Sequence, residues 1–364
     1  MKQLSQHILK TFAILALFTI GFTGCEDELN KLPILGELES NFYQNEDDAI
    51  AAITAAYDPL QYNFTNSVYH FRWFFGDFSS DDAIKGGSGV TDQPQLEALS
   101  VFQGTANNIH TNADWTAKYI GIYRANLVIE NVGSMTNDMI DPDFKAQLVA
   151  EAYFLRAHYY FELVTMYGGV PLVDKLLLPS EYNTPRSSAE EIWALIESDL
   201  TEAAAFLPNK SEYNSTQVGR ATKGAALALL AKAHLYQGEW QEAQTNAELV
   251  VNSGEYSLDE DYRDIFVKSG ENGPGSIFEI QRSPFGGGYW GSVNGANEGN
   301  LAVVYQLPRG QFGGWGFNLP TQDFVDEFEE GDPRLKSSVF MEGDTLGDRG
   351  VFTKAATGFD HDYY

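Results

Sequence analysis

Cysteine is almost absent from this chain, whose 364 residues contain only Cys25. A single cysteine excludes an intrachain disulfide and any zinc site built mainly from cysteine. Histidine is also scarce, and no His-Glu-x-x-His motif occurs among the isolated residues His70, His110, His158, His234 and His361. We therefore predict no metal ion and no cofactor.

Basic residues are few, with 23 Lys and Arg against 51 Asp and Glu and a formal net charge of −28. Such a chain has no spare cations to displace the counterions of a nucleic acid, so we predict no nucleic-acid partner. A basic patch for docking on anionic lipid is excluded for the same reason. Attachment to a membrane would therefore need a covalent anchor.

Catalytic motifs are missing or broken. The Gly-x-Ser-x-Gly elbow fails at Val90, and the acidic stretch 259–264 lacks the glycine and glutamate of a calcium loop. The glycines of 286–291 fit a dinucleotide fingerprint, but 292–300 (SVNGANEGN) cannot form the helix that must follow. We predict that the protein is not an enzyme. A polysaccharide-degrading enzyme stays open as an alternative, because a pair of carboxylates needs no fixed spacing in sequence.

The amino terminus has the pattern of a lipoprotein signal. Lys2 and Lys10 precede an apolar run, 11–22, that is too short to span a bilayer and ends Phe22-Thr-Gly-Cys25. We expect a signal peptide over 1–24, acylation of Cys25 and a tether over 25–40. Leucine is usual at the position of Phe22, so ordinary secretion with a free Cys25 remains the alternative.

Helical periodicity dominates the rest of the chain. The strongest pattern lies between Asp141, a predicted N-cap, and Gly168-Gly169, which ends the helix. Its repeating positions are Phe144, Leu148, Ala152, Leu155, Tyr159, Leu163 and Met166. Further helices are predicted near 46–57, 115–127, 187–206 and 319–328, and a strand over 276–281.

Residues 219–252 predict a helical hairpin. The spacing Gly238-x-Trp240-x-x-Ala243-x-x-x-Ala247 is similar to a tetratricopeptide unit, in which small residues allow two helices to pack closely. We predict a mainly α fold: one domain over 41–364, built as a tetratricopeptide-like helix-pair array with an irregular loop-rich lobe and a few short strands.

Two loop regions, 60–110 and 281–318, combine aromatic rings with hydrogen-bonding side chains. The apolar face of a sugar stacks on Trp or Tyr, while its hydroxyls need polar groups at the rim. We expect Phe74, Phe75 and Phe312 to be structural. The predicted ligand-binding residues are Arg72, Trp73, Asp77, Asp82, Asn107, Tyr289, Trp290 and Trp315.

Three stretches resemble one known family. These are the signal ending at Cys25, the string EAYFLRAHYYFELVTMYGGVPL over 151–172, and Leu319–Phe328 followed by Asp332-Pro-Arg-Leu335. Together they resemble the SusD/RagB family of Bacteroidetes outer-membrane lipoproteins, and the acidic residues 26–28 resemble the export tag of surface lipoproteins in this lineage. The Arg-Tyr-Ala-Glu-type string of a further long helix is absent, so we expect a chain truncated at its C-terminus.

The resemblance implies a function in nutrient uptake. A SusD-like protein is lipid-anchored in the outer membrane, faces the cell exterior and captures a glycan, either an oligosaccharide or a polysaccharide. It passes this ligand to a SusC-like TonB-dependent transporter. Capture of a non-glycan cargo such as peptides is the second alternative.

Overall fold

The computed structural model describes residues 42–65, 68–282, 301–358 and 361–364. The chain divides into two units, Met1–Gln44 and Asn45–Tyr364, and the elements from α4 to α14 belong to the second. Cys25 and the predicted signal peptide and tether lie outside the described residues, as do Tyr289 and Trp290. No helix among the described residues combines the length and apolar character needed to cross a membrane.

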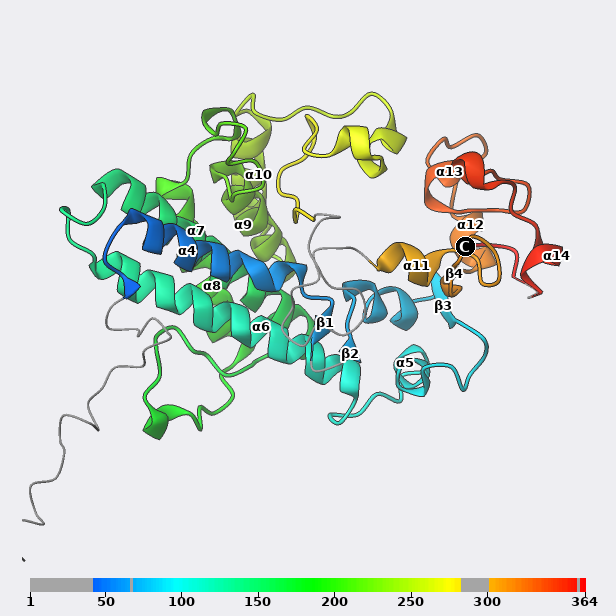
Figure 1. Cartoon of the computed structure of the whole chain (residues 1–364), viewed down its shortest axis with the longest axis horizontal. Coiled ribbons are helices and arrows are strands. Elements are labelled where there is room, and N and C mark those ends of the chain that lie inside the picture. The colour runs from blue at the N-terminus through cyan, green and yellow to red at the C-terminus, as the bar shows by residue number, and fades with distance from the viewer. Residues whose placement is uncertain (1–41, 66–67, 283–300, 359–360) are drawn as a thin grey trace, which may run out of the picture. The chain divides into compact units, whose positions relative to one another are not determined.

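Long helices that pack in sequence order form the core of this unit (Figure 1). Helix α7 is central, because it contacts α4, α6, α8 and α9, and α10 packs on α9. This arrangement confirms the predicted mainly α helix-pair array. The bounds are α4 Glu46–Tyr57, α6 Ile109–Leu127, α7 Pro142–Tyr167, α8 Ala189–Phe206, α9 Lys223–Gln237 and α10 Trp240–Val251.

The ends of α7 are as predicted. The side chain of Asp141 accepts hydrogen bonds from the backbone N–H groups of Asp143 and Phe144, and Pro142 occupies the first helical position. At the other end Gly168 takes a φ of +69°, in the region that favours glycine.

Two buried charged residues of α7 join the array together. Arg156 donates from Nε and Nη2 to both carboxylate oxygens of Asp199 on α8, and from Nη1 to Oδ1 of Asn126 on α6. Glu151 accepts hydrogen bonds from Arg220 and from the hydroxyl of Tyr57. Burial raises the pKa of Glu151, and Arg220 partly offsets this effect.

The helix predicted near 115–127 is present as α6, but its bulky residues do not all face the core. Small residues face the core instead, because Gly121 lies against the ring of Tyr159 on α7 and leaves no room for a side chain. The bulky Trp115 and Tyr119 are only half-buried, and Tyr123 is 55% exposed. Close approach of the two helices therefore turns these rings away from the core.

Short elements make the loop-rich lobe (Figure 1). Strand β3 pairs antiparallel with β4, with Ile84 opposite Leu319, and β1 pairs with β2 in a hairpin. Their bounds are β1 Phe64–Thr65, β2 Val68–Tyr69, β3 Ala83–Gly86, β4 Phe317–Pro320, α5 Pro94–Ser100, α11 Ala302–Gln306, α12 Gln322–Asp326, α13 Leu335–Ser338 and α14 Lys354–Thr357.

Two sequence predictions of elements fail. The predicted strand 276–281 is irregular chain, whose polar side chains bond to nearby loops, as Gln281 does to Asn272. The predicted helix 319–328 starts only at Gln322, because Leu319 and Pro320 belong to β4 and pair with β3. At 319–320 the pairing with β3 outweighs the helical pattern. At 276–281 the lack of a partner strand outweighs the strand pattern.

Candidate functional site

The two loop regions that the sequence singled out meet in one aromatic cluster. Its buried members come from 71–96 and from 305–317, and the half-buried rings of Tyr69, Trp73, Phe75 and Trp315 pack against them. Tyr305 of the second region contacts both tryptophans, and its ring centroid lies 6.0 Å from that of Trp73 and 4.7 Å from that of Trp315. The buried members are Phe71, Phe74, Phe78, Leu96, Tyr305 and Phe317.

Neither tryptophan of this cluster has its whole ring available for stacking on a ligand. Trp73 stacks on Phe71 with ring centroids 5.3 Å apart and meets Phe74 edge-on. Its buried indole Nε1 has no hydrogen-bond partner among the described residues. Trp315 is held by its backbone, since its N–H donates to the carbonyl of Val304. Each ring therefore offers only part of its surface to a ligand.

The residues expected to be structural do pack. Phe74 is fully buried, and Phe75 lies against the aromatic cluster. Phe312 packs instead against Phe340, in a separate cluster that also holds Leu319.

The two predicted acidic residues lie together at the β3–β4 pair. The amide Nδ2 of Asn318 donates to Asp77 at 2.8 Å, and the backbone carbonyl of Asp82 accepts from Thr321. Burial and then the charge of Asp82 raise the pKa of Asp77. A concavity of about 260 Å³ lined partly by Asn318 and Pro320 adjoins this corner. Asn107, by contrast, is exposed in the turn before α6 and is not part of the aromatic cluster.

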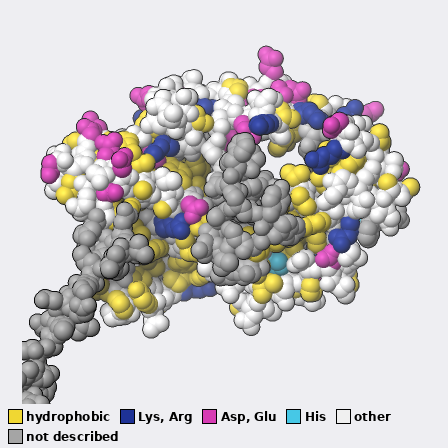
Figure 2. Space-filling model, viewed as in Figure 1, with side chains coloured by type: hydrophobic (Ala, Val, Ile, Leu, Met, Phe, Trp, Pro, Cys, Tyr) yellow, Lys and Arg dark blue, Asp and Glu magenta, His cyan; other side chains and the backbone are white. Residues whose placement is uncertain are grey.

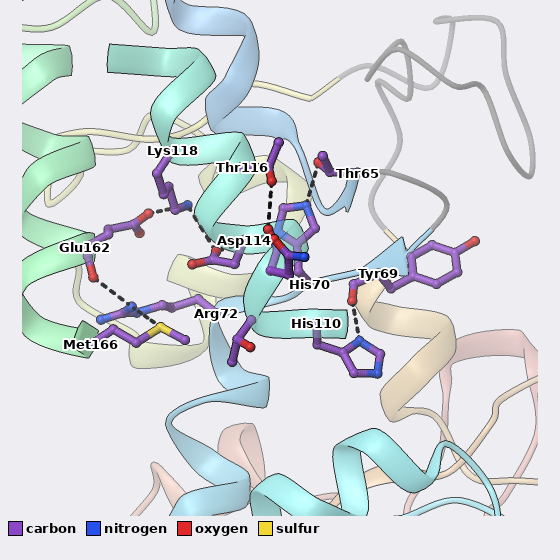
Figure 3. Close-up of polar contacts among 12 residues, drawn as sticks. Thr65, Tyr69, His70, Arg72, His110, Asp114, Thr116, Lys118, Glu162 and Met166 are labelled. Carbon is purple, nitrogen blue, oxygen red and sulfur yellow. Dashed lines mark hydrogen bonds and ion pairs between the residues drawn. The ribbon is translucent and has the colours of Figure 1, made fainter. Parts of the chain in front are cut away.

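The side chain of Arg72 extends toward α7 (Figure 3). Its Nη2 donates to Oγ1 of Thr165 at 3.0 Å, and its Nη1 donates to the carbonyl of Glu162 at 3.5 Å. The guanidinium therefore fixes this segment on the helix array, and its contact with a ligand stays a prediction.

A buried polar network links the chain around the β1–β2 hairpin to α6 and α7, and the sequence did not reveal it (Figure 3). His70 Nε2 lies 2.8 Å from Thr65 Oγ1, and Nδ1 lies 3.6 Å from Asp114 Oδ1. Lys118 pairs with both Asp114 and Glu162. Burial alone would raise the pKa of Glu162, but Lys118 and then His158 lower it to about 2.

The order Thr65, His70, Asp114 matches that of a nucleophile, a base and an orienting carboxylate. However, His70 and Asp114 are each 2% exposed, so no substrate reaches them. His110 adds a bond of 2.6 Å to the carbonyl of Tyr69. Burial lowers the pKa of both His70 and His110. The network therefore holds the β1–β2 hairpin on α6. The histidines looked isolated because Asp114 is distant in sequence from His70, and Tyr69 from His110.

Comparison with known proteins gives a consistent result. Residues 50–235 match a SusD-like family model described as "Starch-binding associating with outer membrane". SusD-like protein P38 of Formosa agariphila is 30% identical over 276 residues, which are 74% of this chain and 51% of that protein. The chain thus spans about half the length of this relative.

Solved structures show the same fold. A laminarin binding SusD-like protein is 30% identical with a TM-score of 0.75, over 82% of this chain and 66% of that one. Surface glycan-binding protein A from Bacteroides thetaiotaomicron, in complex with laminarihexaose, is 25% identical with a TM-score of 0.73. That match covers 81% of this chain and 63% of the other. These proteins are named for binding and not for catalysis, in agreement with the predicted non-enzymatic role.

Proposed function

The chain belongs to the SusD-like family, and from this membership we propose that it is a cell-surface protein that binds glycan for nutrient uptake. The observation that carries the proposal is the meeting of 69–99 and 301–317 in one aromatic cluster. Two segments more than 200 residues apart thereby bring Trp73 and Trp315 around a shared Tyr305. Relatives of the same fold are named for binding laminarin or laminarihexaose.

We place the ligand on the half-buried side of this cluster. Trp73 and Trp315 supply ring surface, and Asp77 and Asp82 supply hydrogen-bonding groups nearby, with Asn107, Tyr289 and Trp290 as further predicted contacts. The rings are fixed by their packing, so little side-chain entropy is lost when a sugar stacks on them. Because binding of a sugar breaks no covalent bond, no catalytic group is required.

Family membership also supports a location and a partner. We infer an outer-membrane protein that is anchored through acylated Cys25 after removal of 1–24 and faces the exterior. Its domain over 41–364 would pass the ligand to a SusC-like TonB-dependent transporter. Two acyl chains would hold the protein durably, because each buried methylene contributes about 0.8 kcal/mol.

The ligand is proposed to be a neutral glycan. With 51 acidic and 23 basic residues the chain repels polyanions, and Figure 2 shows hydrophobic side chains exposed between charged ones on one face. Stacking and neutral hydrogen bonds therefore suit an uncharged sugar better than a uronate.

The test is affinity electrophoresis and calorimetry with laminarin, starch and a polyuronate. Trp73→Phe combined with Trp315→Ala removes stacking surface while keeping a ring in the core, and should weaken binding about tenfold or more, or ~1.4 kcal/mol. Trp240→Ala removes an exposed indole of α10 and serves as the matched control. If the double variant binds glycan with wild-type affinity and its melting temperature is unchanged, the ligand does not bind at this cluster.

The same samples separate the alternatives. Release of reducing ends from any polysaccharide would indicate an enzyme. Binding of peptides without binding of any glycan would instead indicate the other cargo.

A further inference from the structure

A second ring-lined concavity lies between α6 and the segment 171–184. Its volume is about 360 Å³, and none of its lining residues belongs to the aromatic cluster. We propose that it is a second carbohydrate-binding site that takes a neutral oligosaccharide. The class of ligand rests on the proposed function, whereas the location rests on the geometry that follows.

One wall is a row of rings along α6. Trp115, Tyr119 and Tyr123 are four residues apart, so each lies about 6 Å further along the helix on the same face. Tyr119 is fixed because its hydroxyl donates to the carbonyl of Pro171 at 2.7 Å. Trp115 is braced edge-on by Tyr167, with centroids 5.1 Å apart. Successive fixed rings suit successive sugar units of one chain.

The opposite wall is also held in place. Asn126 of α6 donates from Nδ2 to the backbone carbonyls of Val173 and Lys175, at 3.0 and 3.2 Å. A bridge between Pro171 and Arg186 closes the two ends of the segment. The concavity therefore exists before a ligand arrives, which lowers the entropic cost of binding.

The rim carries neutral hydrogen-bonding groups that the fold does not use. The hydroxyls of Tyr123 and Tyr182 and the indole N–H of Trp115 have no hydrogen-bond partner in the described part of the chain. Tyr182 is 68% exposed. Lys175, the cation among the lining residues, is already paired with Glu181 at 2.6 Å. A polyol would find apolar faces beside open donors here.

Tyr123 of this row is more exposed than Trp73 and Trp315. The reason is the packing of α6, whose small residues, such as Gly121, lie against α7 and leave the large ones outward. The outward rings line the concavity.

The experiment is hydroxyl-radical footprinting of the full chain with laminarihexaose, maltohexaose, cellohexaose and mannohexaose as probes, followed by titration of variants. At least one probe should protect both Tyr123 and Tyr182 from oxidation. Tyr123→Ala combined with Tyr182→Ala should weaken the binding of that probe at the concavity about tenfold or more. Tyr236→Ala is the matched control, because Tyr236 is a helical tyrosine 58% exposed on α9.

The variants distinguish the two sites. If the Tyr123/Tyr182 variant and its control bind every probe alike and neither tyrosine is protected, the second site is refuted while the proposed function stands. If Trp73→Phe with Trp315→Ala abolishes binding and also the protection of Tyr182, the concavity is not an independent site. If a protein partner but no sugar protected these two tyrosines from oxidation, the concavity would bind protein and not carbohydrate. That result would overturn the inference.

Discussion

At the scale of single residues, Arg156 of α7 forms a buried ion pair with Asp199 of α8. Arg156 is 4% exposed and Asp199 is 2% exposed, and their two bonds of 2.8 Å satisfy both charges. Burial of two ions is favourable only when the partners match in this way. Arg156 belongs to the family-like string over 151–172, and its presence there is therefore explained by its bonds inside the protein.

Arg156→Ala should lower the free energy of unfolding by about 3–5 kcal/mol, because it leaves Asp199 buried without its partner. Urea denaturation followed by circular dichroism measures this change. Lys175→Ala breaks an exposed pair with Glu181 and should leave the transition where it is. Equal effects of the two substitutions would contradict the central role of Arg156.

At the scale of elements, the close approach of α6 and α7 depends on one glycine. A Cβ added at Gly121 would lie 2.3 Å from a ring atom of Tyr159, which is itself fully buried and donates its hydroxyl to the carbonyl of Ala56. The ring could move only by giving up its buried contacts and this hydrogen bond. This contact sets the face that α6 turns outward.

Gly121→Ala should therefore destabilise the protein by about 1–3 kcal/mol despite the better helix propensity of alanine. Gly133→Ala is the control, since a Cβ there would meet only Val149 at 3.9 Å in ordinary contact. Thermal unfolding of both variants gives the comparison. A Gly121 variant as stable as the Gly133 variant would mean that α6 and α7 adjust freely.

At the scale of the whole molecule, buried histidines make stability depend on pH. The pKa values of His70 and His110 are lowered by burial, so below about pH 6.5 the unfolded chain binds protons that the folded chain refuses. Their contribution is complete above the unfolded pKa and is lost as the pH falls toward the folded pKa. The raised pKa values of Glu151 and Asp199 act in the opposite direction.

A comparison of wild type with His110→Gln isolates one histidine from those carboxyls. Between pH 7.5 and 5.5 the wild type should lose more stability than the variant, by up to about 1.4 kcal/mol per pH unit. Urea denaturation at several pH values measures both slopes. Parallel slopes would show that His110 titrates normally in the folded protein.

The sequence by itself determined the helix array, because caps such as Asp141 and a repeating apolar face are local signals. It also identified which loops carry aromatic rings, and the family through a string of residues on α7. It did not determine which side of α6 faces outward, since bulky and small residues both repeat with the helix. Only the tertiary structure decided that. Contacts between distant segments joined Trp73 to Trp315 through Tyr305, bound Arg72 to α7, and opened the hollow beside Trp115.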